Sequence, residues 1–575
     1  MKPKGSSRFI CVKCGHMETT DEEPGKPTSL RDCFPFRSVR PAQDAVLREV
    51  ESALKTKRFV ILEAPVGFGK SAVAIALCKY LGSAHILTAT KQLQDQYSSE
   101  FGYPLVKGKA NFQCYIRPTS GALLPCSKGR CEVDWELKDC PHYLSFDEYE
   151  KHAKKLCDAE SKCEHLKDRK LCTYYDQKWY GFRASVTVYN YSFLLNELKY
   201  SRNVPPRKLL VCDEVHELEK QIVGFASFQL KKNLLQSYYD ELEPGDIFEM
   251  PHKGVDDPTA WLDVLTNVED LLSRYLETHK EADEQQERVA GCRNLQVAME
   301  AFMDDLRKHG DNWVVNSAKV DSNLSVDEVT FQPLNVSSYT APLFKMAEKV
   351  LLMSATIFSD ERLYQSLGIP PSEAAVIRIE DSVFPVNNRP IYALNTAYLS
   401  KASMDLSLES IAQAVDRILD RHAGERGVIH TTSYLQARYI VQHVSERNRT
   451  RLLATEGGFD KSTLIRMHGA SDASVLISPA LHQGVDLKDD LSRFQVIVKV
   501  PYPDLSDRRT QTKLQRDRTW YAWQTAQRLV QTYGRSVRSE TDHATTYVLD
   551  SNFPRFVTMN RSLFPKYFVE AIKES

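Results

Sequence analysis

Several features that would place the chain in other protein classes are missing from its 575 residues. It has no run of 18 apolar residues, so we expect no membrane span and no membrane partner. Its formal net charge of -1 gives no global basic field, so any nucleic-acid binding must use local grooves. No apolar signal region precedes Cys11. We therefore expect a soluble, intracellular protein, cytoplasmic or, in a eukaryote, nuclear.

A glycine-rich turn directly follows the apolar run of residues 59–62. After Glu63, the turn consists of Ala64, Pro65, Val66, Gly67, Phe68, Gly69, Lys70 and Ser71. Between a strand and a helix, the backbone amides of such a turn bind a triphosphate, Lys70 reaches the outer phosphates and Ser71 ligates magnesium. The turn departs from the usual motif at Ala64, which replaces the first glycine, and at Val66.

Two further segments supply the chemistry that this phosphate loop requires. The apolar run of residues 208–212 ends in Asp213 and Glu214. At the end of a buried strand, Asp213 can hold magnesium and Glu214 can polarise the attacking water as general base. The alternative, a surface acidic pair, is disfavoured by the upstream phosphate loop. Far downstream, Gln531 precedes Arg535 and Arg538, which share one helix face and can neutralise a transferring phosphoryl group.

Additional short motifs lie before and between these segments. They are Arg40 with Gln43, Thr88 and Thr90 with Gln92, residues 354–356, residues 427–434 with Thr432, and Gly484 with Asp486. In order and type they resemble the Q, Ia, III, IV and V motifs of the XPD/DinG-like branch of superfamily 2 helicases, and the resemblance covers residues 36–550. It implies ATP contacts from Arg40, Gln43, Gly484 and Asp486. It also implies DNA contacts from Thr88, Thr90, Gln92 and Thr432.

The resemblance implies an α/β fold with two RecA-like P-loop motor domains. A cysteine-rich iron–sulfur insertion and a helical Arch-like insertion would lie in the first. We expect an N-terminal extension (1–35), a first motor domain (36–108, 177–229 and 331–370), an iron–sulfur domain (109–176), an Arch-like insertion (230–330) and a second motor domain (371–575). Within 230–330, strand-like runs give way to helical periodicity at residues 260–265 and 295–302. A helical spacer without DNA contact is the alternative.

Thirteen cysteines are unusual for an intracellular protein, where disulfides are not expected. Seven of them cluster at Cys114, Cys126, Cys131, Cys140, Cys157, Cys163 and Cys172. The resemblance places a four-cysteine [4Fe–4S] cluster in this block, and soft thiolates suit iron. We expect Cys114 and Cys172 to be ligands, with Cys126 and Cys131 as the inner pair or Cys157 and Cys163 in their place. Zinc is the competing metal.

The remaining cysteines have other expected roles. Cys11 and Cys14, with His16 and Cys33 nearby, have half the spacing of a zinc knuckle, so they either bind zinc or form an oxidisable terminal segment. Cys78, Cys212 and Cys292 are expected to be core residues.

Taken together, the motifs predict an ATP- and magnesium-dependent DNA helicase. By resemblance it moves 5′ to 3′ on single strands and opens forked DNA in repair or replication. A translocase or remodeller with little unwinding is a second hypothesis, and a catalytically idle nucleic-acid-binding module is a third, which the intact catalytic residues disfavour. The sequence does not separate DNA from RNA, and a monomer is compatible with it. Trp520 and Trp523 could stack on bases, although a core position is favoured.

Overall fold

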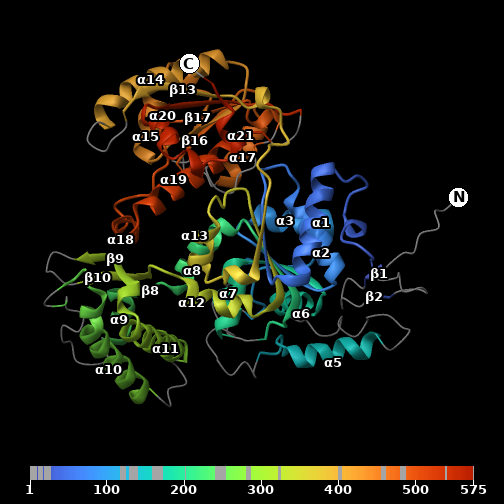
Figure 1. The fold of residues 1–575 in the computed structure, drawn as a ribbon. Coiled ribbons are helices and arrows are strands. Elements are labelled where there is room, and N and C mark those ends of the chain that lie inside the picture. The colour runs from blue at the N-terminus through green and yellow to red at the C-terminus, as the bar shows by residue number, and fades with distance from the viewer. Residues whose placement is uncertain are drawn as a thin grey trace.

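Two seven-stranded sheets, each wholly parallel, form the centres of the two largest parts of the molecule (Figure 1). The computed structural model describes residues 9–10, 17–18, 27–116, 125–128, 140–157, 172–200, 203–239, 251, 254–279, 286–320, 326–398, 404–454, 461–479, 487, 489–537 and 541–573. No helix within these ranges is both long enough and apolar enough to cross a bilayer.

The first sheet carries the phosphate loop. In spatial order its strands are β12 (Ala374–Arg378), β3 (Phe59–Glu63), β11 (Ala347–Ser354), β7 (Arg207–Asp213), β4 (Ala84–Thr88), β6 (Val186–Asn190) and β5 (Leu105–Val106). Alternate residues of β3 pack into separate cores on the two faces, as expected for a parallel sheet covered on both sides. Because β12 completes this sheet, the predicted end of the first motor domain at residue 370 is wrong, and the sheet continues to Arg378.

Helices cover both faces of this sheet. They are α1 (Pro41–Thr56), α2 (Lys70–Leu81), α3 (Lys91–Phe101), α6 (Thr173–Arg183), α7 (Tyr191–Tyr200), α8 (Leu218–Ala226), α12 (Ser337–Phe344) and α13 (Asp360–Leu367). Leu30 and Cys33 also pack into this core, so the first motor domain begins before the predicted residue 36. The short strands β1 (Phe9–Ile10) and β2 (Met17–Glu18) pair with each other. Cys11, Cys14 and His16 lie outside the described residues.

The second sheet begins after residue 390. Its strands in spatial order are β15 (Leu452–Ala454), β16 (Val475–Ser478), β14 (Gly427–His430), β17 (Phe494–Ile497), β18 (Thr545–Asp550), β13 (Ile391–Ala397) and β19 (Ile572–Lys573). Its helices are α14 (Met404–Arg421), α15 (Tyr434–His443), α16 (Glu446–Arg449), α17 (Lys461–Gly469), α18 (Arg508–Arg516), α19 (Arg518–Tyr533), α20 (Asn552–Met559) and α21 (Lys566–Val569). Both RecA-like motor domains predicted from the sequence are therefore present.

The segment predicted to be a helical insertion has a mixed fold. Its helices are α9 (Lys232–Tyr239), α10 (Leu262–Thr278) and α11 (Gln286–Lys308). They pack on an antiparallel sheet of β8 (Phe228–Lys231), β10 (Val326–Pro333) and β9 (Trp313–Val320), in that order (Figure 1). The expectation that strands disappear here was wrong. Buried and partly exposed positions alternate irregularly along β10, and a bulge interrupts its pairing with β9, which blurs the period-two pattern.

Helix α18 joins the second motor domain to this insertion and to the first motor domain. It extends from α19 toward β9 (Figure 1). The Arg509 guanidinium and the Lys513 ammonium both donate to one carboxylate oxygen of Glu219 on α8, at 2.5 Å and 2.6 Å. Arg509 also donates to the carbonyls of Pro333 and Leu334 at the end of β10. All three charged groups of this cluster are mostly buried. The charges of Arg509 and Lys513 and the opposite charge of Glu219 therefore offset each other's cost of removal from water.

We predict that Glu219→Gln releases α18, because it leaves two buried cations without their counter-charge. A loss of about 3 kcal/mol corresponds to roughly 100-fold faster amide hydrogen exchange in α18 and β9, provided that these elements exchange by local opening. Glu269→Gln, on the partly exposed surface of α10, is the control. Unchanged protection of α18 would show that the cluster does not hold it.

The same cluster predicts a pH dependence. Although burial raises the pKa of Glu219, the charges of Lys513 and Arg509 lower it to about 2. The stabilisation is therefore fully present above the ordinary carboxyl pKa of 4.5 and is lost as the pH falls toward 2.

Candidate functional site

The carboxyl ends of three neighbouring strands position the candidate site. β11 pairs with β3 on one side and with β7 on the other, all in parallel. The phosphate loop after β3, residues 354–357 after β11 and Asp213 at the end of β7 therefore meet at one edge of the sheet. In open parallel sheets, this edge is where ligands bind.

The phosphate loop has the backbone shape that its glycines allow. Gly67 and Gly69 have φ angles of 78° and 95°, a conformation that side chains disfavour. A Cβ atom at Gly67 would also lie 2.1 Å from the Phe384 ring. Ala64 is not among the described residues with positive φ, so its position does not require glycine. This explains the replacement of the first glycine of the usual motif.

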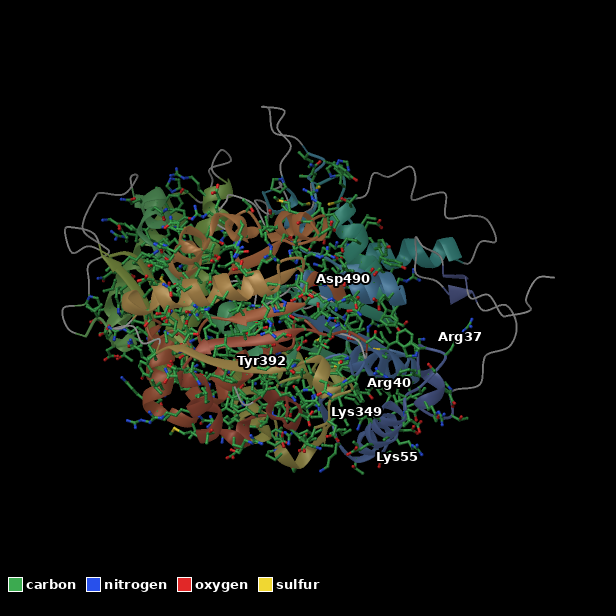
Figure 2. All side chains as sticks on the ribbon, turned by 90° about the horizontal axis from the view of Figure 1, so that it is seen from above. Arg37, Arg40, Lys55, Lys349, Tyr392 and Asp490 are labelled. Carbon is green, nitrogen blue, oxygen red and sulfur yellow. The ribbon has the colours of Figure 1, made fainter. Side chains whose placement is uncertain are left out.

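Lys70 and the predicted adenine-side residues contact the loop itself. Lys70 Nζ donates to the Ala64 carbonyl at 2.9 Å. Gln43 Nε2 and Arg40 Nη2 both donate to the Phe68 carbonyl, at 2.7 Å and 2.8 Å. Arg37 and Arg40 lie on the same side of the molecule, near the start of α1 (Figure 2). Arg40 and Gln43 thus fix the loop geometry.

Asp213 is held on both of its carboxylate oxygens. The Tyr97 hydroxyl donates to Oδ2 at 2.8 Å, and the Glu214 amide donates to Oδ1 at 3.0 Å. Burial and the neighbouring Glu214 raise the pKa of Asp213 to about 7. A buried carboxylate of this kind favours a nearby cation, and a divalent metal supplies one.

Glu214 is surrounded by donors. His216 Nδ1 lies 3.2 Å from Glu214 Oε2, and the Ser354 hydroxyl donates to the same oxygen at 3.3 Å. Burial raises the pKa of Glu214, but the hydrogen bond and charge of His216 outweigh it, and the net pKa lies well below the usual value. Burial lowers the pKa of His216, but its bonds to Glu214 and Glu217 raise it to about 9. Glu214 therefore stays ionised and can accept a hydrogen bond from water.

Residues after β11 connect this edge to the second motor domain. Gln527 and Gln531 of α19 donate to the Thr356 carbonyl and hydroxyl, at 2.6 Å and 2.5 Å. Trp523 Nε1 donates to the Ile357 carbonyl at 2.9 Å. Trp520 and Trp523 are both buried, which confirms the core interpretation of these tryptophans.

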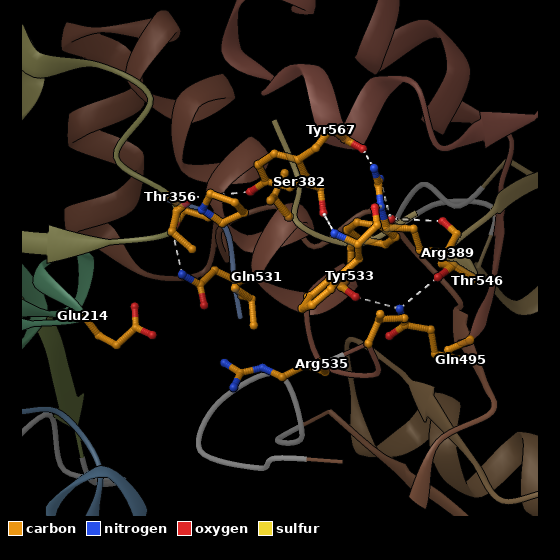
Figure 3. A pocket seen from close by; sticks show the side chains of 18 residues that line it. Glu214, Thr356, Ser382, Arg389, Gln495, Gln531, Tyr533, Arg535, Thr546 and Tyr567 are labelled. Carbon is orange, nitrogen blue, oxygen red and sulfur yellow. Dashed lines mark hydrogen bonds between the residues drawn. The ribbon is translucent and has the colours of Figure 1, made fainter. Parts of the chain in front are cut away.

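One pocket is lined by both motor domains (Figure 3). Pro65, Val66 and Glu214 line it from the first domain, and Gln531, Gly534 and Arg535 from the second. The Arg535 guanidinium points toward the side of the pocket where Glu214 lies (Figure 3), and its charge lowers the Glu214 pKa. Three predicted residues, Gly484, Asp486 and Arg538, lie outside the described residues.

The residues predicted to contact a nucleic-acid strand differ in their exposure to solvent. Gln92 and Thr432 are exposed, and Thr90 is partly exposed and caps α3 by accepting from the Leu93 amide. Thr88 is fully buried, so its hydroxyl is closed off from a passing strand and this part of the prediction is wrong. Thr432 lines a second pocket with Lys499 and Arg528.

Four cysteines from separate segments line one small pocket. They are Cys114, Cys126, Cys140 and Cys172. The sulfurs of Cys126 and Cys172 lie 3.7 Å apart, and this contact lowers the pKa of Cys172 to about 6 against the effect of burial. Within the described ranges, no three potential ligands are grouped closely enough to hold a single metal ion. Cys131 and Cys163 lie outside those ranges, as does the side chain of Cys157, the last residue of α5 (Phe146–Cys157).

Sequence reasoning missed Tyr97, Cys140 and the role of His216. Tyr97 occupies a helical position with no recognisable motif, so only its contact with Asp213 reveals it. Cys140 belonged to the cysteine block but to neither predicted spacing. His216 lies two residues after Glu214 and could have been recognised from its position.

Comparisons with known proteins agree with this architecture. Residues 417–571 match the model of a helicase C-terminal domain, and residues 113–235 match the DEAD_2 family model. A probable ATP-dependent helicase of Methanocaldococcus jannaschii is 20% identical, with 92% of this chain and 94% of that protein covered. A solved XPD helicase has a TM-score of 0.61 at 17% identity, covering 92% of this chain and 99% of that one. The S. tokodaii Xpd4 structure has a TM-score of 0.56 at 15% identity, covering 93% and 99%.

Two RecA-like domains with a phosphate loop at their interface define a P-loop motor, and the matched family models are those of helicases. The chain is similar in fold to XPD helicases, and its two family matches are to the helicase C-terminal domain and to DEAD_2. It is an ATP-hydrolysing helicase.

We predict that Arg535→Ala lowers the ATP turnover rate by roughly 100-fold or more, because its charge acts mainly on the transition state. Affinity for a non-hydrolysable ATP analogue, measured by calorimetry, should change far less. Arg518→Ala, an exposed arginine at the start of α19, the helix that ends two residues before Arg535, is the matched control. Lost nucleotide binding with normal turnover at saturation would contradict this assignment.

Proposed function

We propose that this helicase moves 5′ to 3′ along single-stranded DNA and separates forked duplexes during repair or replication. The observation that carries the proposal is the pocket shared by Glu214 of one motor domain and Arg535 of the other, beside the phosphate loop. A nucleotide at this position contacts both domains, so hydrolysis can change their separation.

In the proposed cycle, ATP occupies the cleft with its outer phosphates beside Lys70. Ser71 and Asp213 hold magnesium, which neutralises charge on the phosphates when bound. The ionised Glu214, held by His216 and Ser354, orients and polarises the attacking water. Arg535 and Arg538 then stabilise the charge that develops as the phosphoryl group leaves. We also assign Gly484 and Asp486 to the ATP site.

The contacts between the domains supply a route from hydrolysis to motion. Gln531 touches both Thr356 and His216, and His216 touches Glu214. Loss of the phosphate alters the charge beside Glu214 and Arg535 and allows the cleft to open. If the two domains grip the strand with different strength in the two states, the strand advances.

The strand itself would lie across exposed polar groups on the two motor domains. Thr90 and Gln92 provide these on the first domain, and Thr432 on the second. Lys499 and Arg528 line the pocket beside Thr432, so a phosphate passing there would meet positive charge. Because such groups contact backbone rather than base edges, we expect little sequence preference.

We further propose that the cysteine pocket holds a [4Fe–4S] cluster. Four thiols from separate segments face one pocket, and the lowered pKa of Cys172 favours the thiolate that iron requires. Cys114, Cys126, Cys140 and Cys172 would therefore be the ligands, with Cys140 in place of Cys131. A bound cluster would cross-link these segments into a rigid edge where the duplex parts. In the same scheme, residues 228–333 form an Arch-like domain.

The central test is strand displacement on DNA with either a 5′ or a 3′ single-stranded tail. We expect unwinding from the 5′ tail only. Lys70→Ala should lower ATP hydrolysis and unwinding by at least ~100-fold, because a transition-state phosphate contact is lost.

Lys79→Ala, an exposed lysine on the same helix, is the matched control and should retain full activity. Normal strand-stimulated hydrolysis by Lys70→Ala would end the motor assignment. Hydrolysis without displacement of either substrate would favour a translocase, and preference for RNA tails would replace the DNA assignment.

The cluster ligands are tested by iron and sulfide content. Protein purified without oxygen should contain about four irons, and Cys140→Ala should lose them together with unwinding while retaining some hydrolysis. Cys131→Ala and the core variant Cys292→Ala should retain iron. Loss of iron in Cys131→Ala but not in Cys140→Ala would reverse the assignment, and colourless protein with bound zinc would exclude the cluster.

A further inference from the structure

One buried phenol contacts a proposed magnesium residue without belonging to any motif. Tyr97 lies in the middle of α3, only 1% exposed, and its hydroxyl donates to Asp213 Oδ2 at 2.8 Å. Tyr97 therefore touches one of the two side chains that are proposed to hold magnesium.

The surrounding core holds this phenol in place. Because the Tyr97 ring packs in the same core as α2 and β3, its hydroxyl has little freedom to move.

The carboxylate cannot easily rotate away from this donor. Oδ1 accepts from the Glu214 amide, and Oδ2 accepts from Tyr97, so both ends of the Asp213 carboxylate are fixed. In addition, the Tyr191 hydroxyl donates to the Asp213 carbonyl at 2.8 Å, which holds the backbone of the same residue. A carboxylate fixed in this way presents its remaining lone pairs in one direction, and hydrogen bonds to a metal-binding carboxylate tune metal affinity.

We propose that Tyr97 is a positioning residue that orients Asp213 toward magnesium and sets the metal affinity of the ATP site. This inference rests on the proposed role of Asp213 in holding magnesium. Tyr97 acts through Asp213 and takes no part in proton transfer.

The test is Tyr97→Phe, which keeps the buried ring and removes only the hydroxyl. Binding of Mn²⁺ to the protein–ADP complex, followed by the electron paramagnetic resonance of free Mn²⁺, should weaken at least fivefold. ADP affinity without metal should stay within twofold of the parent protein. The Mg²⁺ concentration for half-maximal ATPase should rise by the same factor, and saturating Mg²⁺ should restore most of the turnover rate.

Tyr189→Phe is the matched control, because Tyr189 is also fully buried and its phenol lies beside Thr187 and Arg207 instead. It should bind Mn²⁺ as the parent does. If Asp213→Asn abolishes Mn²⁺ binding while Tyr97→Phe binds Mn²⁺ as tightly as the parent protein, the positioning role alone is overturned. Parent-like affinity in Asp213→Asn would overturn the proposed magnesium site and this inference with it.

Discussion

The hydrogen bonds between α19 and residues 354–357 are the interaction on which the ATP site depends. The catalytic groups come from two domains, so the contact that joins the domains determines the relative position of these groups. Gln527, Gln531 and Trp523 bond to the two residues that follow β11. On the other side, Glu63 accepts from the amides of Ile357 and Phe358 at 2.8 Å and 2.9 Å. One short segment is therefore tied to both the phosphate-loop strand and α19, the helix that precedes Arg535.

Glu63 shows how a buried charge can serve this arrangement. Its carboxylate is almost fully buried, and it accepts two backbone bonds and a 2.7 Å bond from Arg378. Removing water from a carboxylate is costly unless donors replace it, and here three donors do. Arg378 in turn pairs with Asp360 at the start of α13. The ion pairs thus link the edge strand β12, the loop strand β3 and the segment after β11, three parts that are distant in sequence.

Much of the architecture could be predicted because local sequence determines it. The phosphate loop needs positive φ at Gly67 and Gly69, and the apolar runs at β3, β7 and β11 are too short and too rich in branched residues for helices. The strands β9 and β10 could not be predicted as easily, because their alternation is broken by a bulge. The burial of Thr88 was not predicted either, because the sequence at the end of a strand does not show whether a hydroxyl faces the solvent or the core.

Other features depend on contacts between distant residues, which no local pattern encodes. The Glu219 cluster joins residues 290 and more positions apart, and the bond between Tyr97 and Asp213 spans 116. Cys140 shares a pocket with Cys114 only through the folding of the block between them. In each case the residue type alone does not indicate the role of the side chain, because that role follows from the contact with a distant partner.

Helix α3 shows why such contacts matter for a motor. Its first turn carries Thr90 and Gln92, the groups proposed to meet the strand, and its middle carries Tyr97 against Asp213. A helix transmits a displacement along its length because its backbone bonds are stiff compared with side-chain rotations. A nucleic-acid strand that displaced the first turn would therefore also displace the phenol proposed to orient Asp213. On the opposite side of the cleft, α19 carries Gln531, ends two residues before Arg535 and contacts α18, which in turn contacts the insertion. The ATP site thus lies between two helices, one leading toward the proposed strand and one toward the inserted domain, so events at either place can alter the geometry of hydrolysis.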